Sequence, residues 1–118
     1  MDPKTYTGLV LNGKKRGTAL GFPTLNIPLN DSFTSGIYIG KVEARGETHE
    51  AAIFADQKRG LLEAYLLDFE GNLYGETITV TLLDRLRDSR EFDDDEKLKA
   101  EIMKDVETVR WYFKNKEA

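Results

Sequence analysis

The segment 21–26, Gly-Phe-Pro-Thr-Leu-Asn, places a hydroxyl and a carboxamide two residues apart. Pro23 fixes its own φ and restrains Phe22, which favours an extended backbone here. In an extended segment the side chains of Thr24 and Asn26 project to the same side. Their neutral oxygens are hard ligands that can hold Mg²⁺ while phosphate oxygens and water fill the other positions. The alternative is that both side chains bond their own backbone in a turn.

A glycine-rich, basic stretch precedes this segment. Residues 13–21 read Gly-Lys-Lys-Arg-Gly-Thr-Ala-Leu-Gly, which matches neither a P-loop nor a dinucleotide-binding fingerprint. Residues 1–30 hold four basic side chains and one acidic one, although the whole chain has a net charge of −4. A local positive patch on an acidic protein suits a small anion such as a nucleotide. The alternative is a solvated basic turn whose glycines only shape the backbone.

A third candidate is Glu63, the lone carboxylate of the apolar run 61–67. Burial in such a run disfavours the charged form, so we expect a raised pKa. A base that titrates near neutrality beside a substrate hydroxyl can serve phosphoryl transfer, which otherwise depends on positioning and charge neutralisation. The alternative is a strand residue at the rim of a barrel with a salt-bridge partner.

These candidates must be positioned by a chain whose first three quarters alternate between short apolar runs and turns. The pattern predicts strands at 6–11, 37–44, 48–54, 61–69 and 77–83. Residues 13–35 lack a regular period and predict a long structured loop. Short strands with such turns favour an antiparallel sheet that closes as a barrel and so removes its edges.

The C-terminal quarter has a helical period. Asp93 is predicted to cap the helix, with Glu96 three residues on as in a capping box. One apolar stripe follows at spacings of three and four, and it comprises Leu98, Ile102, Val106, Val109 and Phe113. We therefore expect a helix that packs across the barrel.

Composition limits the remaining possibilities. A length of 118 residues suits one domain, which we place at 1–118. The chain has no cysteine, which excludes disulfides and thiolate zinc sites and fits a reducing cytoplasm. The acidic balance disfavours nucleic-acid binding, and no apolar run approaches the roughly 20 residues of a membrane span.

Several segments resemble riboflavin kinases in the order that this family has them. Residues 17–27 resemble the stretch commonly written G-R-x-L-G-F-P-T-A-N-I. Residues 36–38 resemble G-V-Y, and 62–69 resemble L-E-x-H-L-L-D-F. Residues 73–76 resemble D-L-Y-G-x, and 86–92 resemble the R…K-F stretch before the last helix. The resemblance covers nearly the whole chain.

The resemblance implies a mainly β fold, a six-stranded Greek-key antiparallel barrel with a C-terminal α-helix. The implied reaction transfers the γ-phosphate of ATP to the 5′-hydroxyl of riboflavin, giving FMN and ADP with Mg²⁺ as cofactor. Glu63 then corresponds to the catalytic base, and Thr24 and Asn26 to the metal ligands. The implied nucleotide-binding residues are Gly13, Lys15, Arg16, Gly17, Gly21, Pro23 and Thr24. Arg87 and Phe92 fall where the family's flavin-side loop lies.

We therefore expect a stand-alone cytoplasmic riboflavin kinase that is a monomer, without the adenylyltransferase domain of many bacterial relatives and without nucleic-acid or membrane partners. Two stretches depart from the family. Thr18 replaces an arginine, and the loop at 55–60 is short and lacks the family's Pro-Thr pair. The short loop motivates a rival hypothesis, a non-catalytic flavin- or nucleotide-binding module of the same fold. A second rival is a barrel that serves only protein interaction.

Overall fold

The computed structural model describes residues 3–11 and 21–116. Antiparallel strands make up most of this part of the chain, and a single long helix follows them. The strands are β1 (Lys4–Leu9), β2 (Leu25–Pro28), β3 (Gly36–Ala44), β4 (Glu47–Asp56), β5 (Leu61–Leu66) and β6 (Thr77–Arg87), and the helix is α2 (Asp95–Lys116).

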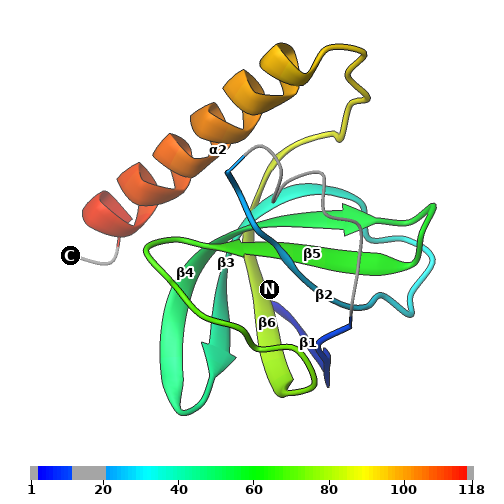
Figure 1. The fold of residues 1–118 in the computed structure, drawn as a ribbon, viewed down its shortest axis with the longest axis vertical. Helices are drawn as coiled ribbons and strands as arrows, with labels where there is room; N and C mark the ends of the chain where they lie inside the picture. Colours follow the sequence, from blue (N-terminus) through cyan, green and yellow to red (C-terminus); the bar gives the residue numbers. More distant parts are fainter. Residues whose placement is uncertain (1–2, 12–20, 117–118) are drawn as a thin grey trace.

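The strands form one sheet in the order β1-β6-β3-β4-β5-β2. Consecutive hairpins join β3, β4 and β5, whereas β2 lies beside β5 and not beside its neighbour in sequence, β3. This is the Greek-key arrangement. The sheet curls into a nearly closed barrel, and α2 lies across one side of it (Figure 1). The predicted fold is confirmed.

The barrel closes where β1 meets β2. The amide of Leu11 donates to the carbonyl of Asn26 at 2.7 Å, in an isolated antiparallel bridge. A Cβ atom on Gly8 would lie 3.3 Å from both Ile27 and Pro28, so a glycine here lets the two strands pack closely. In the described residues, β1 and β2 are not joined by a regular series of backbone hydrogen bonds. This side of the barrel is therefore closed by side-chain packing and by the one bridge.

Apolar side chains fill the inside of the barrel, and a second cluster lies outside it under α2. The inner cluster includes Ile27, Val42, Ile53, Leu62, Ile78 and Val80, all fully buried. The outer cluster joins Ile39, Leu67, Val106, Val109 and Phe113. The pairing of β3 with β6 is irregular at two points, where Leu83 and Leu86 have no partner residue on β3. Both leucines pack against the outer cluster. The bulges thus turn additional apolar side chains toward the helix.

Two arginine–carboxylate pairs fasten α2 to the barrel. Arg87, the last residue of β6, donates from Nε and Nη2 to Asp105 at 3.1 and 2.7 Å. Arg110 donates from both terminal nitrogens to Asp68, each at 2.8 Å. Such two-point pairing fixes orientation as well as position. Both pairs therefore help to orient the helix over the outer cluster.

Four predictions made from the pattern were wrong. Residues 13–35 were expected to be a loop, but β2 lies within them, because four residues ending in proline give too short a run to show a period. The strand from residue 61 ends at Leu66, whereas β6 continues to Arg87. The helix is capped by Asp94 and not Asp93, since Asp94 Oδ1 accepts from the amide of Glu96 at 2.8 Å.

Candidate active site

The site predicted from sequence forms around one cross-strand pair. Asn26 on β2 lies directly opposite Glu63 on β5, and Glu63 lies opposite Phe54 on β4. Residues paired in this way share a face of the sheet, with Cβ atoms about 5 Å apart. Their sequence neighbours Ile27 and Leu62 belong to the inner core, so Asn26 and Glu63 project from the outer face. Two residues 37 positions apart, each expected to do chemistry, are thus brought together.

An aromatic contact holds the start of this segment on the same face. The ring of Phe22 packs edge-on against Tyr65 on β5, with centroids 5.4 Å apart. Both rings belong to the margin of the outer cluster. Thr24 lies between Phe22 and Asn26 in sequence and is partly buried. The segment 22–26 therefore runs along β5 with its alternate residues toward the outer face.

Asn26 has a polar atom that the described residues leave without a partner. The residue is only 2% exposed, and its Oδ1 has no hydrogen-bond partner in the part of the chain that the structure describes. A buried oxygen in this state raises the free energy of the fold by about 1–3 kcal/mol. Orphaned buried polar groups are rare in native proteins and call for a functional or chemical reason. A cation bound at this oxygen would be such a reason.

Glu63 has a basic partner in the turn between β4 and β5. Arg59 donates from Nη2 to Glu63 Oε2 at 2.8 Å and from Nε to Asp56 Oδ2 at 2.7 Å. The Asp56 hydrogen bond, ahead of the contact with Glu63, raises the pKa of Arg59 despite an opposing effect of burial. The salt-bridge alternative is thus realised, in the same place as the predicted base.

Sequence reasoning did not identify Arg59 as part of the site. The signal was present, because Asp56, Arg59 and Glu63 are separated by three and four residues around a turn that ends in Gly60. Such spacings bring charges together across a tight hairpin. The short loop at 55–60, which seemed only a departure from the family, thus supplies a charged neighbour for Glu63.

Arg87 and Phe92 lie apart from this pair in the described contacts. The hydrogen bonds to Asp105 raise the pKa of Arg87, and its Nη1 donates to the carbonyl of Asp88 at 3.1 Å. Phe92 has the guanidinium of Arg90 over its ring, 5.2 Å from the centroid. Contact of either residue with a flavin stays a prediction.

The remaining predicted nucleotide-binding residues divide into two groups. Gly13, Lys15, Arg16 and Gly17 lie outside the described residues. Gly21 has a φ of +94°, a backbone conformation that residues with a side chain rarely adopt. Pro23 is exposed. The backbone that enters the segment 22–26 is therefore set by a glycine and a proline, as the sequence indicated.

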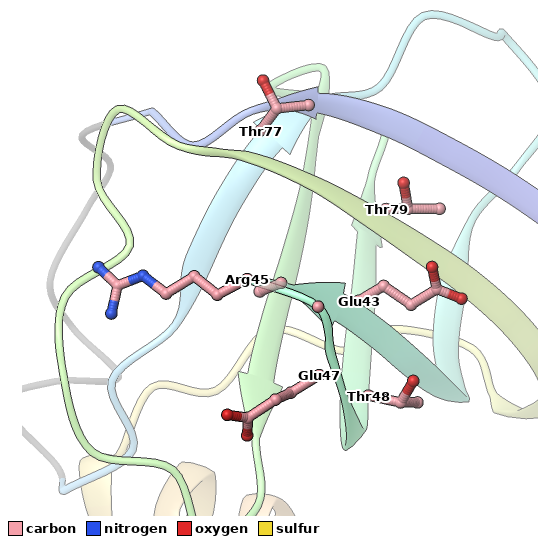
Figure 2. Close-up of a pocket in the computed structure, with 8 residues that line it drawn as sticks. Glu43, Arg45, Glu47, Thr48, Thr77 and Thr79 are labelled. Carbon is pink, nitrogen blue, oxygen red and sulfur yellow. The ribbon is translucent and has the colours of Figure 1, made fainter.

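A hollow of about 280 Å³ lies elsewhere, at the tip of the β3–β4 hairpin (Figure 2). Its labelled side chains include Glu43, Arg45 and Thr79, and Arg45 extends away from the other two. Because β4 runs from this hairpin to the turn that carries Arg59, the hollow and that turn lie at opposite ends of β4. None of the predicted site residues that the structure describes lines the hollow.

The chain is similar in sequence to known riboflavin kinases. The sequence model of riboflavin kinase (flavokinase) matches residues 1–113. A bifunctional riboflavin kinase/FMN adenylyltransferase of Listeria monocytogenes is 36% identical over 121 residues, which cover 94% of this chain and 38% of the relative. The chain thus spans about two fifths of the length of the curated relatives it matches.

Two solved structures share the fold. Riboflavin kinase from Trypanosoma brucei matches 98% of this chain and 82% of its own, with a TM-score of 0.71 at 23% identity. A Streptococcus pneumoniae chain described as a macrolide-efflux protein matches 92% of this chain and 38% of its own, with a TM-score of 0.79 at 32% identity. In the described residues no helix has the length and apolar character to cross a membrane. The family match and the identity to the Listeria relative together show that the chain belongs to the riboflavin kinase family.

Proposed function

We propose that this chain is a riboflavin kinase that transfers the γ-phosphate of ATP to the 5′-hydroxyl of riboflavin, giving FMN and ADP. The observation that carries the proposal is the direct pairing of Asn26 with Glu63 on the outer face of β2 and β5. This pairing puts a neutral oxygen ligand beside a carboxylate, so a phosphate group and a hydroxyl could be held side by side. Family membership supplies the identity of the two substrates.

The residues present fit a magnesium ion. The orphaned Oδ1 of Asn26 and the hydroxyl of Thr24, two residues earlier, are oxygen ligands of the kind that Mg²⁺ accepts. The described residues contain no group of three or more histidine, cysteine, aspartate or glutamate side chains that could hold a metal. The ion would therefore complete its shell with phosphate oxygens and water, and when bound it would offset phosphate charge.

Glu63 is proposed as the base. Its side chain is 13% exposed and lies beside the residue proposed to hold the metal, where it could accept the proton of the riboflavin hydroxyl. Arg59 holds this carboxylate through a hydrogen bond of 2.8 Å from Nη2 to Oε2. Asn26 and Thr24 would orient the nucleotide. The other residues proposed to bind it are Gly13, Lys15, Arg16, Gly17, Gly21 and Pro23. Arg87 and Phe92 remain the proposed flavin contacts.

The test is formation of FMN. The purified chain is incubated with riboflavin, ATP and Mg²⁺, and the products are separated by chromatography. We expect FMN from the natural sequence and a loss of at least about 100-fold in kcat for Glu63→Gln, which keeps the shape of the side chain but cannot accept the proton. The matched control is Glu43→Gln, an exposed glutamate on the outer face of β3 that lines the hollow of Figure 2; it should be fully active.

Other outcomes would contradict the proposal. An absence of FMN, combined with a melting temperature raised by riboflavin or ADP, would favour the non-catalytic binding module. An absence of FMN with no binding of either ligand would exclude both flavin functions. Full activity of Glu63→Gln would remove Glu63 from the mechanism, and loss of activity in Glu43→Gln would place the chemistry elsewhere.

A further inference from the structure

Three charged side chains form a chain of contacts at the turn between β4 and β5, which we call the turn triad: Asp56, Arg59 and Glu63. Arg59 uses Nε for Asp56 and Nη2 for Glu63, at 2.7 and 2.8 Å. The side chains are 12%, 29% and 13% exposed in that order, so solvent screens their interactions only partly. A planar guanidinium presents its donors in a rigid fork, and two engaged donors fix its plane.

Hydrogen bonds also hold the backbone of the turn that carries Arg59. The amide of Arg59 donates to Asp56 Oδ1 at 3.2 Å, and the carbonyl of Gly60 accepts from the amide of Leu29 at 2.8 Å. Gln57, in the same turn, donates from Nε2 to the carbonyl of Thr34 at 2.8 Å. The turn is thus tied to the connection between β2 and β3. The backbone position from which Arg59 reaches Glu63 is therefore fixed by contacts on both sides of the turn.

We propose that Arg59 is a positioning residue, which holds the Glu63 carboxylate in the orientation in which it accepts the substrate proton, with Asp56 as its anchor. This inference rests on the proposed kinase function. A glutamate side chain has several rotatable bonds and loses substantial conformational freedom when it is fixed. Arg59 fixes it before the substrate arrives, so no part of the binding energy is needed to order the base.

The expected effect follows from that role. A misplacement of about 1 Å in a reacting group can reduce the rate about 100-fold. Loss of Arg59 leaves Glu63 in its strand but removes the contact that orients its carboxylate toward the turn, so we expect a decrease of roughly 10- to 100-fold in kcat. Because Arg59 touches neither substrate in this scheme, the KM values for riboflavin and for MgATP should change less than about threefold.

The experiment uses the full chain and four variants. Arg59→Gln should lose kcat with nearly unchanged KM values, and Arg59→Lys, which keeps the charge but not the fork, should regain part of the loss. Asp56→Asn should show a smaller decrease, because Glu63 keeps its partner. The matched control is Lys58→Gln in the same turn: Lys58 is 86% exposed and pairs with the equally exposed Glu91, so kcat should not change.

The outcomes separate this inference from the proposed function. If the natural chain makes FMN and Glu63→Gln does not, unchanged kcat in Arg59→Gln overturns the positioning role and leaves the kinase standing. A raised KM for MgATP at constant kcat would instead make Arg59 a phosphate-binding residue. If Arg59→Gln does not fold, unchanged kcat in both Arg59→Lys and Asp56→Asn overturns the role. If the natural chain makes no FMN, both proposals fail together.

Discussion

The orphaned oxygen of Asn26 leads to a prediction in which stability and function move in opposite directions. Asn26→Val replaces a buried carboxamide with an apolar side chain of similar size that suits a strand. The unpartnered Oδ1 disfavours the metal-free fold by about 1–3 kcal/mol. Part of that gain is lost to repacking, because valine branches at Cβ and has one side-chain heavy atom fewer than asparagine. We therefore expect a net stabilisation of about 1 kcal/mol, which for 118 residues raises Tm by roughly 4 °C.

The assay is thermal unfolding, first with a chelator and then with Mg²⁺ and ADP. In chelator the variant should melt above the natural chain. With Mg²⁺ and ADP at about 100 times Kd the natural chain should gain about 2.7 kcal/mol of stability, whereas the variant should gain almost none. Such a trade between stability and function is common where a site keeps an unsatisfied group ready for its ligand.

Thr34→Val is the matched control, because it removes a buried polar group whose partners are all present. Thr34 is 1% exposed, and its hydroxyl donates to Asp31 Oδ2 at 2.7 Å and lies 2.8 Å from the Tyr6 hydroxyl. This change should destabilise the fold by about 1–3 kcal/mol. The reasoning is refuted if Asn26→Val also melts lower in chelator. If the variant melts higher yet still responds to Mg²⁺ and ADP, Asn26 does not bind the metal.

Two further predictions concern the framework. Arg87→Met leaves Asp105 without its cation. The side chains of Arg87 and Asp105 are 25% and 11% exposed, so the loss of stability should lie between that of exposed and buried ion pairs, at about 2 kcal/mol. This corresponds to a decrease of roughly 8 °C in Tm, and a decrease of less than about 2 °C would contradict the prediction. Tyr6→Phe removes a 2.6 Å hydrogen bond to Asp31. Burial acts to raise the pKa of Asp31, but hydrogen bonds from Tyr6 and Thr34 outweigh it and hold that pKa well below its usual range. A pKa lowered by folding stabilises the protein above the unfolded value and loses that effect as pH falls. The difference in unfolding free energy between the two proteins, measured in urea, should therefore be constant from about pH 5 to 7 and shrink in acid as Asp31 of the folded variant becomes protonated; a difference that grows in acid would contradict this.

The parts of the fold with a long regular period were predictable from sequence. The threonines of β6 alternate with Ile78, Val80 and Leu82, and this alternation placed the beginning of the strand and its inner face correctly. The apolar stripe of α2 likewise placed its buried side, including Val109 and Phe113. Both signals repeat several times, so a single exceptional residue does not hide them.

The features that escaped prediction depend on tertiary pairing. A four-residue strand such as β2 has no period of its own, and only its partner β5 makes it a strand. The register that sets Asn26 against Glu63 is likewise a property of two segments and cannot be read from either one. Roles for both residues followed from the family resemblance, but their adjacency and the part of Arg59 required the structure.

Asn26 also takes part in the bridge that closes the barrel between β1 and β2, which we call the seam. Its carbonyl accepts the hydrogen bond from Leu11, while its side chain is the proposed ligand for the metal. Local opening of the seam would displace both ends of this residue at once, so ligand capture and seam closure are thermodynamically coupled. The Leu11 amide should therefore exchange its hydrogen for deuterium more slowly when Mg²⁺ and nucleotide are present. Hydrogen exchange at the Leu11–Asn26 bridge would then measure whether the metal and nucleotide are bound.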